Sequence, residues 1–156
     1  MPSQTSLREL QYYANPNNAF WWIVSRIWNF SETIIYAERV VKLTQSGVAV
    51  WDVLADCIRP GSLDSSIEKD SENANNLNEF LLQNPSIRLI AFNGRAANQI
   101  FNRHCSDVSI DFPKIQFVLL PSSSPAHATM RKEQKLVVWF NNITEPSLWQ
   151  IQPSRL

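Results

Sequence analysis

The stretch with the most chemical potential is Gln11–Trp22, QYYANPNNAFWW, which holds five aromatic residues, three asparagines and one proline. An asparagine amide cannot act as a strong base near neutral pH, but its oxygen can hold and orient a water molecule. The same asparagines also suit structural roles. Asn18 stands before a helical pattern as an N-cap, and Asn15 and Asn17 flank Pro16 as in a turn.

A second candidate segment is the serine-rich stretch Pro121–Ala128, PSSSPAHA. Hydroxyl and backbone N–H groups suit phosphate oxygens, and the prolines limit the entropy that the segment loses on binding. Ser122, Ser123 and Ser124 are therefore candidate phosphate ligands. The alternative is a solvated turn.

The composition fits one intracellular domain over residues 1–156. Lysine plus arginine and aspartate plus glutamate both number 14, so the net charge of zero gives no general attraction to polyanions or membranes. Cys57 and Cys105 fit a reducing cytoplasm. No apolar run is long enough for a membrane span.

Apolar periodicity places these segments on alternating strands and helices. Such alternation predicts an α/β fold with a parallel sheet between helices. Ligand sites lie beyond the carboxyl ends of such strands, here after Ala55, Asn93 and Leu120. One predicted helix begins at Ala19, and the others cover Ser31–Gly47, Ala74–Gln83, Arg95–His104 and Arg131–Ile143. The predicted strands cover Val48–Ala55, Ile87–Asn93 and Ile115–Pro121. A long loop is predicted over Asp56–Asn75.

Three stretches in this order, MPSQTSL…YYANPNNAFW, VWDVLADCIRPGSLDSSI and FNGRAA…LLPSSSPAHA, resemble the uracil-DNA glycosylase superfamily. The resemblance covers Met1–Ile143 and is nearest to the hypoxanthine and mismatch-specific uracil branch. It implies a three-layer sandwich with a short, mainly parallel central sheet. The strand and glycine that the family places before Met1 are absent here, so we expect a sheet without its first strand, and association through the exposed edge.

The resemblance also implies roles for the opening stretch. Asn18 matches the catalytic asparagine of the hypoxanthine branch, which positions the attacking water. Tyr13 aligns with the aromatic residue that stacks on the extruded base, and Tyr12 is a second candidate for the pocket wall; the alternative for each tyrosine is core packing. Asn15 and Asn17 stand where relatives often carry histidine and arginine.

The segment Arg59–Ile67 resembles the family's pocket-side loop. There Asp64 or Ser65 can hydrogen-bond the flipped base and Arg59 can meet a phosphate, unless turn formation is their main role. Asn93, at the end of its strand, is placed either to read a base edge or to cap the next helix.

The resemblance therefore implies a monofunctional DNA repair glycosylase that hydrolyses the N-glycosidic bond of a flipped, deaminated base in DNA. Hypoxanthine is the expected substrate, with uracil or xanthine as further ones. The serine-rich loop would grip the duplex, with His127 as a DNA contact or an exposed loop residue. We expect no cofactor and no metal. The alternative is a non-catalytic α/β module that binds nucleic acid or a nucleotide.

Overall fold

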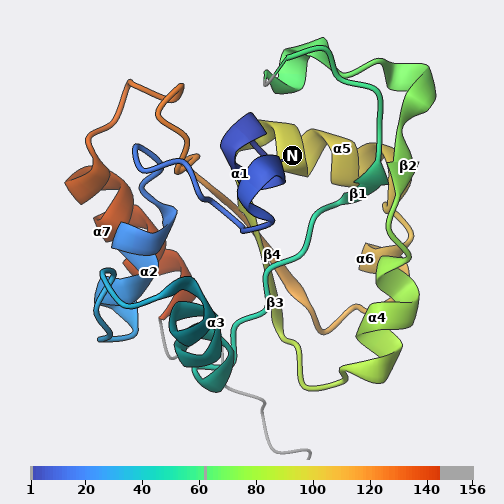
Figure 1. Cartoon of the computed structure of the whole chain (residues 1–156). Coiled ribbons are helices and arrows are strands. Elements are labelled where there is room, and N and C mark those ends of the chain that lie inside the picture. The colour runs from blue at the N-terminus through green and yellow to red at the C-terminus, as the bar shows by residue number, and fades with distance from the viewer. Residues whose placement is uncertain (1, 62, 145–156) are drawn as a thin grey trace, which may run out of the picture.

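A computed structural model describes residues 2–61 and 63–144, so Met1, Ser62 of the predicted pocket-side loop and residues 145–156 lie outside the described residues. Helices and short strands surround a central parallel strand pair (Figure 1). Within the described ranges the elements are α1 (Gln4–Glu9), α2 (Phe20–Ile27), α3 (Tyr36–Gln45), β1 (Leu54–Asp56), the 3-10 turns η1 (Asp64–Ser66) and η2 (Lys69–Ser71), β2 (Asn73–Ala74), α4 (Leu77–Gln83), β3 (Leu89–Asn93), α5 (Arg95–His104), α6 (Val108–Asp111), β4 (Gln116–Leu120) and α7 (Lys132–Ile143).

The central pair is β3 and β4, which run parallel with Leu89 opposite Gln116 and Asn93 opposite Leu120. Parallel neighbours need a crossover connection, and α5 and α6 supply it. The predicted strands 87–93 and 115–121, and the helix between them, are therefore confirmed. Because β3 and β4 end together, the loops that follow them start side by side.

Helices cover both faces of this pair. Alternate strand residues face opposite ways, so Leu89 and Leu120 pack with α2 and α7, whereas Ile90 and Phe92 pack with α4 and α5. The result is a helix–sheet–helix sandwich. The predicted α/β class with a short sheet is confirmed.

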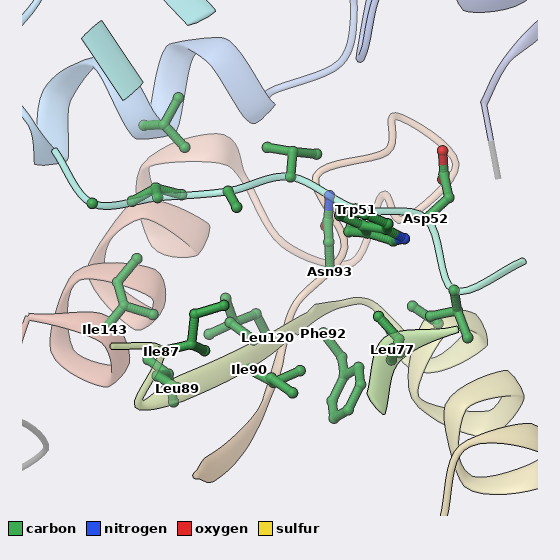
Figure 2. Close-up of a pocket in the computed structure, with 18 of the residues that line it drawn as sticks. Trp51, Asp52, Leu77, Ile87, Leu89, Ile90, Phe92, Asn93, Leu120 and Ile143 are labelled. Carbon is green, nitrogen blue, oxygen red and sulfur yellow. The ribbon is translucent and has the colours of Figure 1, made fainter. Parts of the chain in front are cut away.

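The strand predicted over Val48–Ala55 is largely wrong. Only β1 forms at its end, and β1 pairs antiparallel with β2 in a separate small sheet. Val48 and Val50 do pack against the α2–α7 core, yet a strand also needs a backbone partner. Between this extended segment and β3 lies a cavity of about 320 Å³ instead, which we call the apolar cavity (Figure 2).

Some predicted helices begin later in the structure, such as α4, which begins at Leu77 rather than at Ala74, a residue of β2. The helix expected from Ser31 begins at Tyr36, because the Ser31 hydroxyl accepts a hydrogen bond from the Thr33 N–H at 3.3 Å and stabilises a local turn. Its predicted end at Gly47 is confirmed, and Gly47 has a φ of +78°. The unpredicted α1 begins after Ser3, whose hydroxyl caps its first turn.

A charge cluster ties the long loop to α5. Glu72, whose side chain is 3% exposed, contacts Arg103 at 2.6 Å and His104 at 2.5 Å. Burial alone would raise the pKa of Glu72, but the hydrogen bonds and charges of His104 and Arg103 outweigh it and lower the pKa. The Glu72 carboxylate therefore stays ionised in the folded protein at pH values below the ordinary pKa of a glutamate.

We expect Glu72→Gln to lower the free energy of unfolding at pH 7 by about 1 kcal/mol. A lowered folded-state pKa stabilises the fold above the unfolded pKa, and this contribution is lost as the pH falls through the folded value. The difference between wild type and Glu72→Gln should therefore shrink below about pH 4, as measured by urea unfolding. Glu68→Gln, an exposed change of the same kind, is the control. A difference that persists unchanged at low pH would contradict the role of this carboxylate.

Candidate active site

Asn93 joins three separate parts of the chain at the end of β3. Its side-chain amide donates to the Tyr13 hydroxyl at 3.0 Å and to Ser123 Oγ at 2.8 Å, and its oxygen accepts from the Ser123 N–H at 2.7 Å. It does not cap α5, whose N-cap is Gly94 without a side-chain bond, so that alternative is wrong. That Asn93 reads the base stays a prediction, and it would have to use the remaining lone pair of the Asn93 side-chain oxygen.

Tyr13 is held in one orientation. One ring face stacks on Phe20, with centroids 3.9 Å apart and planes 17° from parallel, and its hydroxyl meets Asn93. Burial, more than any neighbouring charge, raises the pKa of Tyr13 to about 12. The hydroxyl therefore stays protonated at neutral pH. The backbone of Tyr13 has a φ of +55°, a conformation that a non-glycine residue keeps only where its surroundings enforce it.

Asn18 lies in the turn that leads into α2. The residue that flanks this helix is Ala19, so the predicted cap is one position off, although Asn18 Oδ1 still accepts from the Phe20 N–H at 2.9 Å. The Asn18 N–H donates to the Asn15 carbonyl at 2.9 Å. These bonds fix the amide at the start of α2 and leave its second oxygen lone pair and its NH2 group for other partners.

The serine-rich loop is pinned from several sides. Besides the Asn93 bonds, the Ser123 carbonyl accepts from the Ala19 N–H at 3.0 Å and the Ser124 carbonyl accepts from Lys135 Nζ at 3.2 Å. Lys135 is only 4% exposed, and burial lowers its pKa. These bonds hold the loop against β3, the start of α2 and α7.

These residues meet at a second cavity of about 180 Å³ beyond the carboxyl end of β3, which we call the polar cavity. Eight predicted site residues line it: Tyr12, Tyr13, Asn18, Asp64, Asn93, Ser122, Ser123 and Ser124. It is smaller than the apolar cavity, but it is where the polar groups converge. Polar groups that converge on a concavity are what a binding site for a polar ring requires.

Four other predicted site residues do not line the polar cavity. Asn15 uses its side-chain oxygen to accept from the Asn17 N–H at 2.9 Å, as a turn residue does. Arg59 is buried at the side chain, where it contacts the Pro2 carbonyl and pairs with Asp64 at 3.4 Å. The other two are Ser65, in η1, and His127, whose ring contacts Thr129 Oγ1 at 3.3 Å.

Sequence reasoning missed two residues near the site. Asp52 lines the polar cavity, but its segment was assigned to a strand with no role for a carboxylate. Lys135 was missed although its spacing gives a signal. It lies four and eight residues before Trp139 and Ile143, which are both buried, so helical periodicity places it on the core face.

Gly94 allows the serine-rich loop to approach β3. Its φ is +100°, and a Cβ at this position would lie 2.8 Å from Ser122 Cβ. We expect Gly94→Ala to destabilise the fold by about 1–2 kcal/mol more than Gly47→Ala, because overpacking adds to the backbone strain. Gly47 is the matched control, since its φ is +78° with open space around it. Urea unfolding measures the difference, and equal losses for both variants would contradict the close approach.

Among the described residues, no three histidine, cysteine, aspartate or glutamate side chains gather as a metal site would need. Nor does any helix in that part of the chain have the length and apolar character to cross a membrane.

Known proteins that resemble this chain show its family. No family model matches the chain. It is similar to a hypoxanthine DNA glycosylase of Methanosarcina acetivorans, with 32% identity over 137 residues, covering 86% of this chain and 81% of the relative. A hypoxanthine DNA glycosylase of Methanosarcina barkeri is also 32% identical, over 103 residues that cover 64% and 62% of the two chains.

A solution NMR structure from Methanosarcina acetivorans, of a protein provisionally named a uracil DNA glycosylase, superposes with a TM-score of 0.72 and 29% identity, covering 90% of this chain and 84% of that one. The fold and the sequence similarity therefore define a DNA glycosylase of the uracil-DNA glycosylase superfamily. The chain belongs to the hypoxanthine DNA glycosylase family. The predicted superfamily, branch and DNA repair enzyme class are confirmed.

Proposed function

We propose that the chain removes hypoxanthine from DNA, with uracil and xanthine as further substrates, and that the polar cavity receives the flipped base. The observation that carries this proposal is the convergence of Tyr13, Asn18, Asn93 and the loop Ser122–Ser124 on one cavity. The names of the two Methanosarcina relatives support hypoxanthine as the base. A damaged, weakly paired base also costs less to extrude from the duplex.

Each group has a distinct task in this proposal. Tyr13, fixed from behind by Phe20, offers a rigid surface on which the base stacks, worth about 1–3 kcal/mol. The hydroxyl and N–H groups of Ser122–Ser124 bind the flanking phosphates, and Lys135 beneath them adds positive charge. The partner is thus DNA that contains a deaminated base, and the cytoplasm is the proposed location.

The reaction is a hydrolysis. The bond between C1′ and the base nitrogen breaks, a water oxygen held by Asn18 bonds to C1′, and the proton from that water ends on the released base. Charge develops on the departing base, so polar groups around the cavity stabilise the transition state. Lys135 is buried and donates to the Ser124 carbonyl, which does not suit a Schiff base, so we propose a monofunctional enzyme.

The test is release of the free base from matched duplexes with one deoxyinosine, one deoxyuridine or one deoxyxanthosine. We expect the deoxyinosine duplex to yield hypoxanthine and an abasic site, which breaks in hot alkali. A strand break before the alkali step would contradict the monofunctional mechanism. A folded protein that cuts none of the three duplexes would overturn the proposed function.

A further inference from the structure

Asp52 occupies a fixed position in the wall of the polar cavity. Its carbonyl accepts from Asn75 Nδ2 at 2.8 Å, and the next carbonyl, of Val53, accepts from the Asn75 N–H at 2.9 Å. Figure 2 shows Trp51 and Asp52 on the extended segment, with Asn93 at the end of β3. All three line both cavities. Asp52 therefore lies, with its backbone fixed, at the place where the two cavities meet.

The Asp52 carboxylate interacts with Tyr12 and Tyr13, two aromatic residues that line the polar cavity. Burial and then the Asp52 charge and hydrogen bond raise the pKa of Tyr12, and the same charge contributes to the raised pKa of Tyr13. Asp64, the other carboxylate of this cavity, is paired with Arg59 at 3.4 Å. No such cation lies within ion-pair distance of Asp52 in the described residues. Its oxygens are thus the strongest hydrogen-bond acceptors that the cavity wall presents.

Deamination changes one feature of a base that a carboxylate can read. Adenine N1 and cytosine N3 carry lone pairs, whereas hypoxanthine N1 and uracil N3 carry hydrogens. An ionised carboxylate only accepts hydrogen bonds, so it bonds the ring N–H of hypoxanthine or uracil and repels the lone pair of adenine or cytosine. A site built to bond such a hydrogen rejects an analogue that lacks it by large factors.

We propose that Asp52 is a specificity-determining residue that accepts a hydrogen bond from the ring N–H created by deamination. This inference rests on the proposed function and adds the group that distinguishes hypoxanthine and uracil from their parent bases, adenine and cytosine. It assigns a role to a carboxylate in the extended segment, on the side of the cavity that Asn18 and the serine-rich loop do not form.

The test is Asp52→Asn, which keeps the shape and removes the charge. We expect kcat/KM for the deoxyinosine duplex to fall by about tenfold, because the amide oxygen of asparagine still accepts a hydrogen bond but without the charge. Affinity for a duplex with a tetrahydrofuran abasic-site analogue should stay within about twofold, because that ligand has no base to read. Asp70→Asn removes the same charge from an exposed position and should change neither value. Affinity for the analogue separates base reading from a merely structural role.

A second measurement uses the unaltered protein and so does not depend on folding of the variant. A duplex with 1-methyldeoxyinosine lacks the N1–H, and it should be cut at least about tenfold more slowly than deoxyinosine. Equal cutting of the two duplexes, or wild-type cleavage of deoxyinosine by Asp52→Asn, overturns this inference alone. So does a parallel loss of abasic-site affinity and cleavage. If the wild type cuts no deaminated duplex, the proposed function fails as well.

Discussion

Replacing Asn18 with alanine should slow base release by about 100- to 1,000-fold in single-turnover measurements. The amide oxygen is held at the start of α2 by the Phe20 N–H at 2.9 Å, and alanine offers nothing that can hold the attacking water. Affinity for a duplex with an abasic-site analogue should change by less than about threefold. The lost hydrogen bond also costs about 1 kcal/mol of stability, which is too little to unfold a typical domain.

Two further variants test this role of Asn18. Asn18→Asp keeps an oxygen for both the Phe20 N–H and the water, so it should recover a large part of the lost rate. Asn17→Ala, in the same turn, alters an exposed asparagine that does not line the polar cavity, and it should cut as the wild type does. If Asn18→Ala retains more than a third of the wild-type rate, the water-holding role is wrong.

The parts of the fold that could be predicted are those that local pattern determines. Strands β3 and β4 and helices α5 and α7 follow from apolar periodicity, and Gly94 and Pro121 mark the ends of the two strands. The extended segment before β1 has the same apolar character, but whether it forms a strand depends on a distant backbone partner. Local sequence does not contain that information.

The lining of the polar cavity could be predicted where residues follow a strand or precede a helix. Asn93, Ser123 and Asn18 stand at such ends, and the parallel register of β3 and β4 brings them together. Arg59 was placed wrongly because its side chain turns inward to Asp64 and the Pro2 carbonyl. Pairing of this kind is a tertiary contact, and a loop sequence does not reveal it.

The two cavities share the wall that contains Tyr13 and Asn93. The apolar cavity of about 320 Å³ lies on the other side of this wall, so the wall lacks close packing there. The hydrogen bonds of Asn93 therefore contribute more to holding Tyr13 and the serine-rich loop in position.

Replacing Asn93 with leucine should therefore reduce both stability and activity. It removes three hydrogen bonds, to the Tyr13 hydroxyl and to Ser123 Oγ and N–H, and leaves a buried N–H without a partner. We expect the free energy of unfolding to fall by about 2–4 kcal/mol and kcat/KM on the deoxyinosine duplex to fall by more than about 100-fold. Urea unfolding and single-turnover cleavage measure the two effects.

A double-mutant cycle with Tyr13→Phe separates a joint role from two independent ones. Tyr13→Phe alone removes one of the three bonds and keeps the stacking ring, so it should cost about 1 kcal/mol. If Asn93 orients Tyr13, the free energy of unfolding of the double variant should lie within a few tenths of a kcal/mol of that of Asn93→Leu, because the shared bond is already lost. Strict additivity would instead mean that Tyr13 is held by Phe20 alone and that Asn93 acts on the serine-rich loop only.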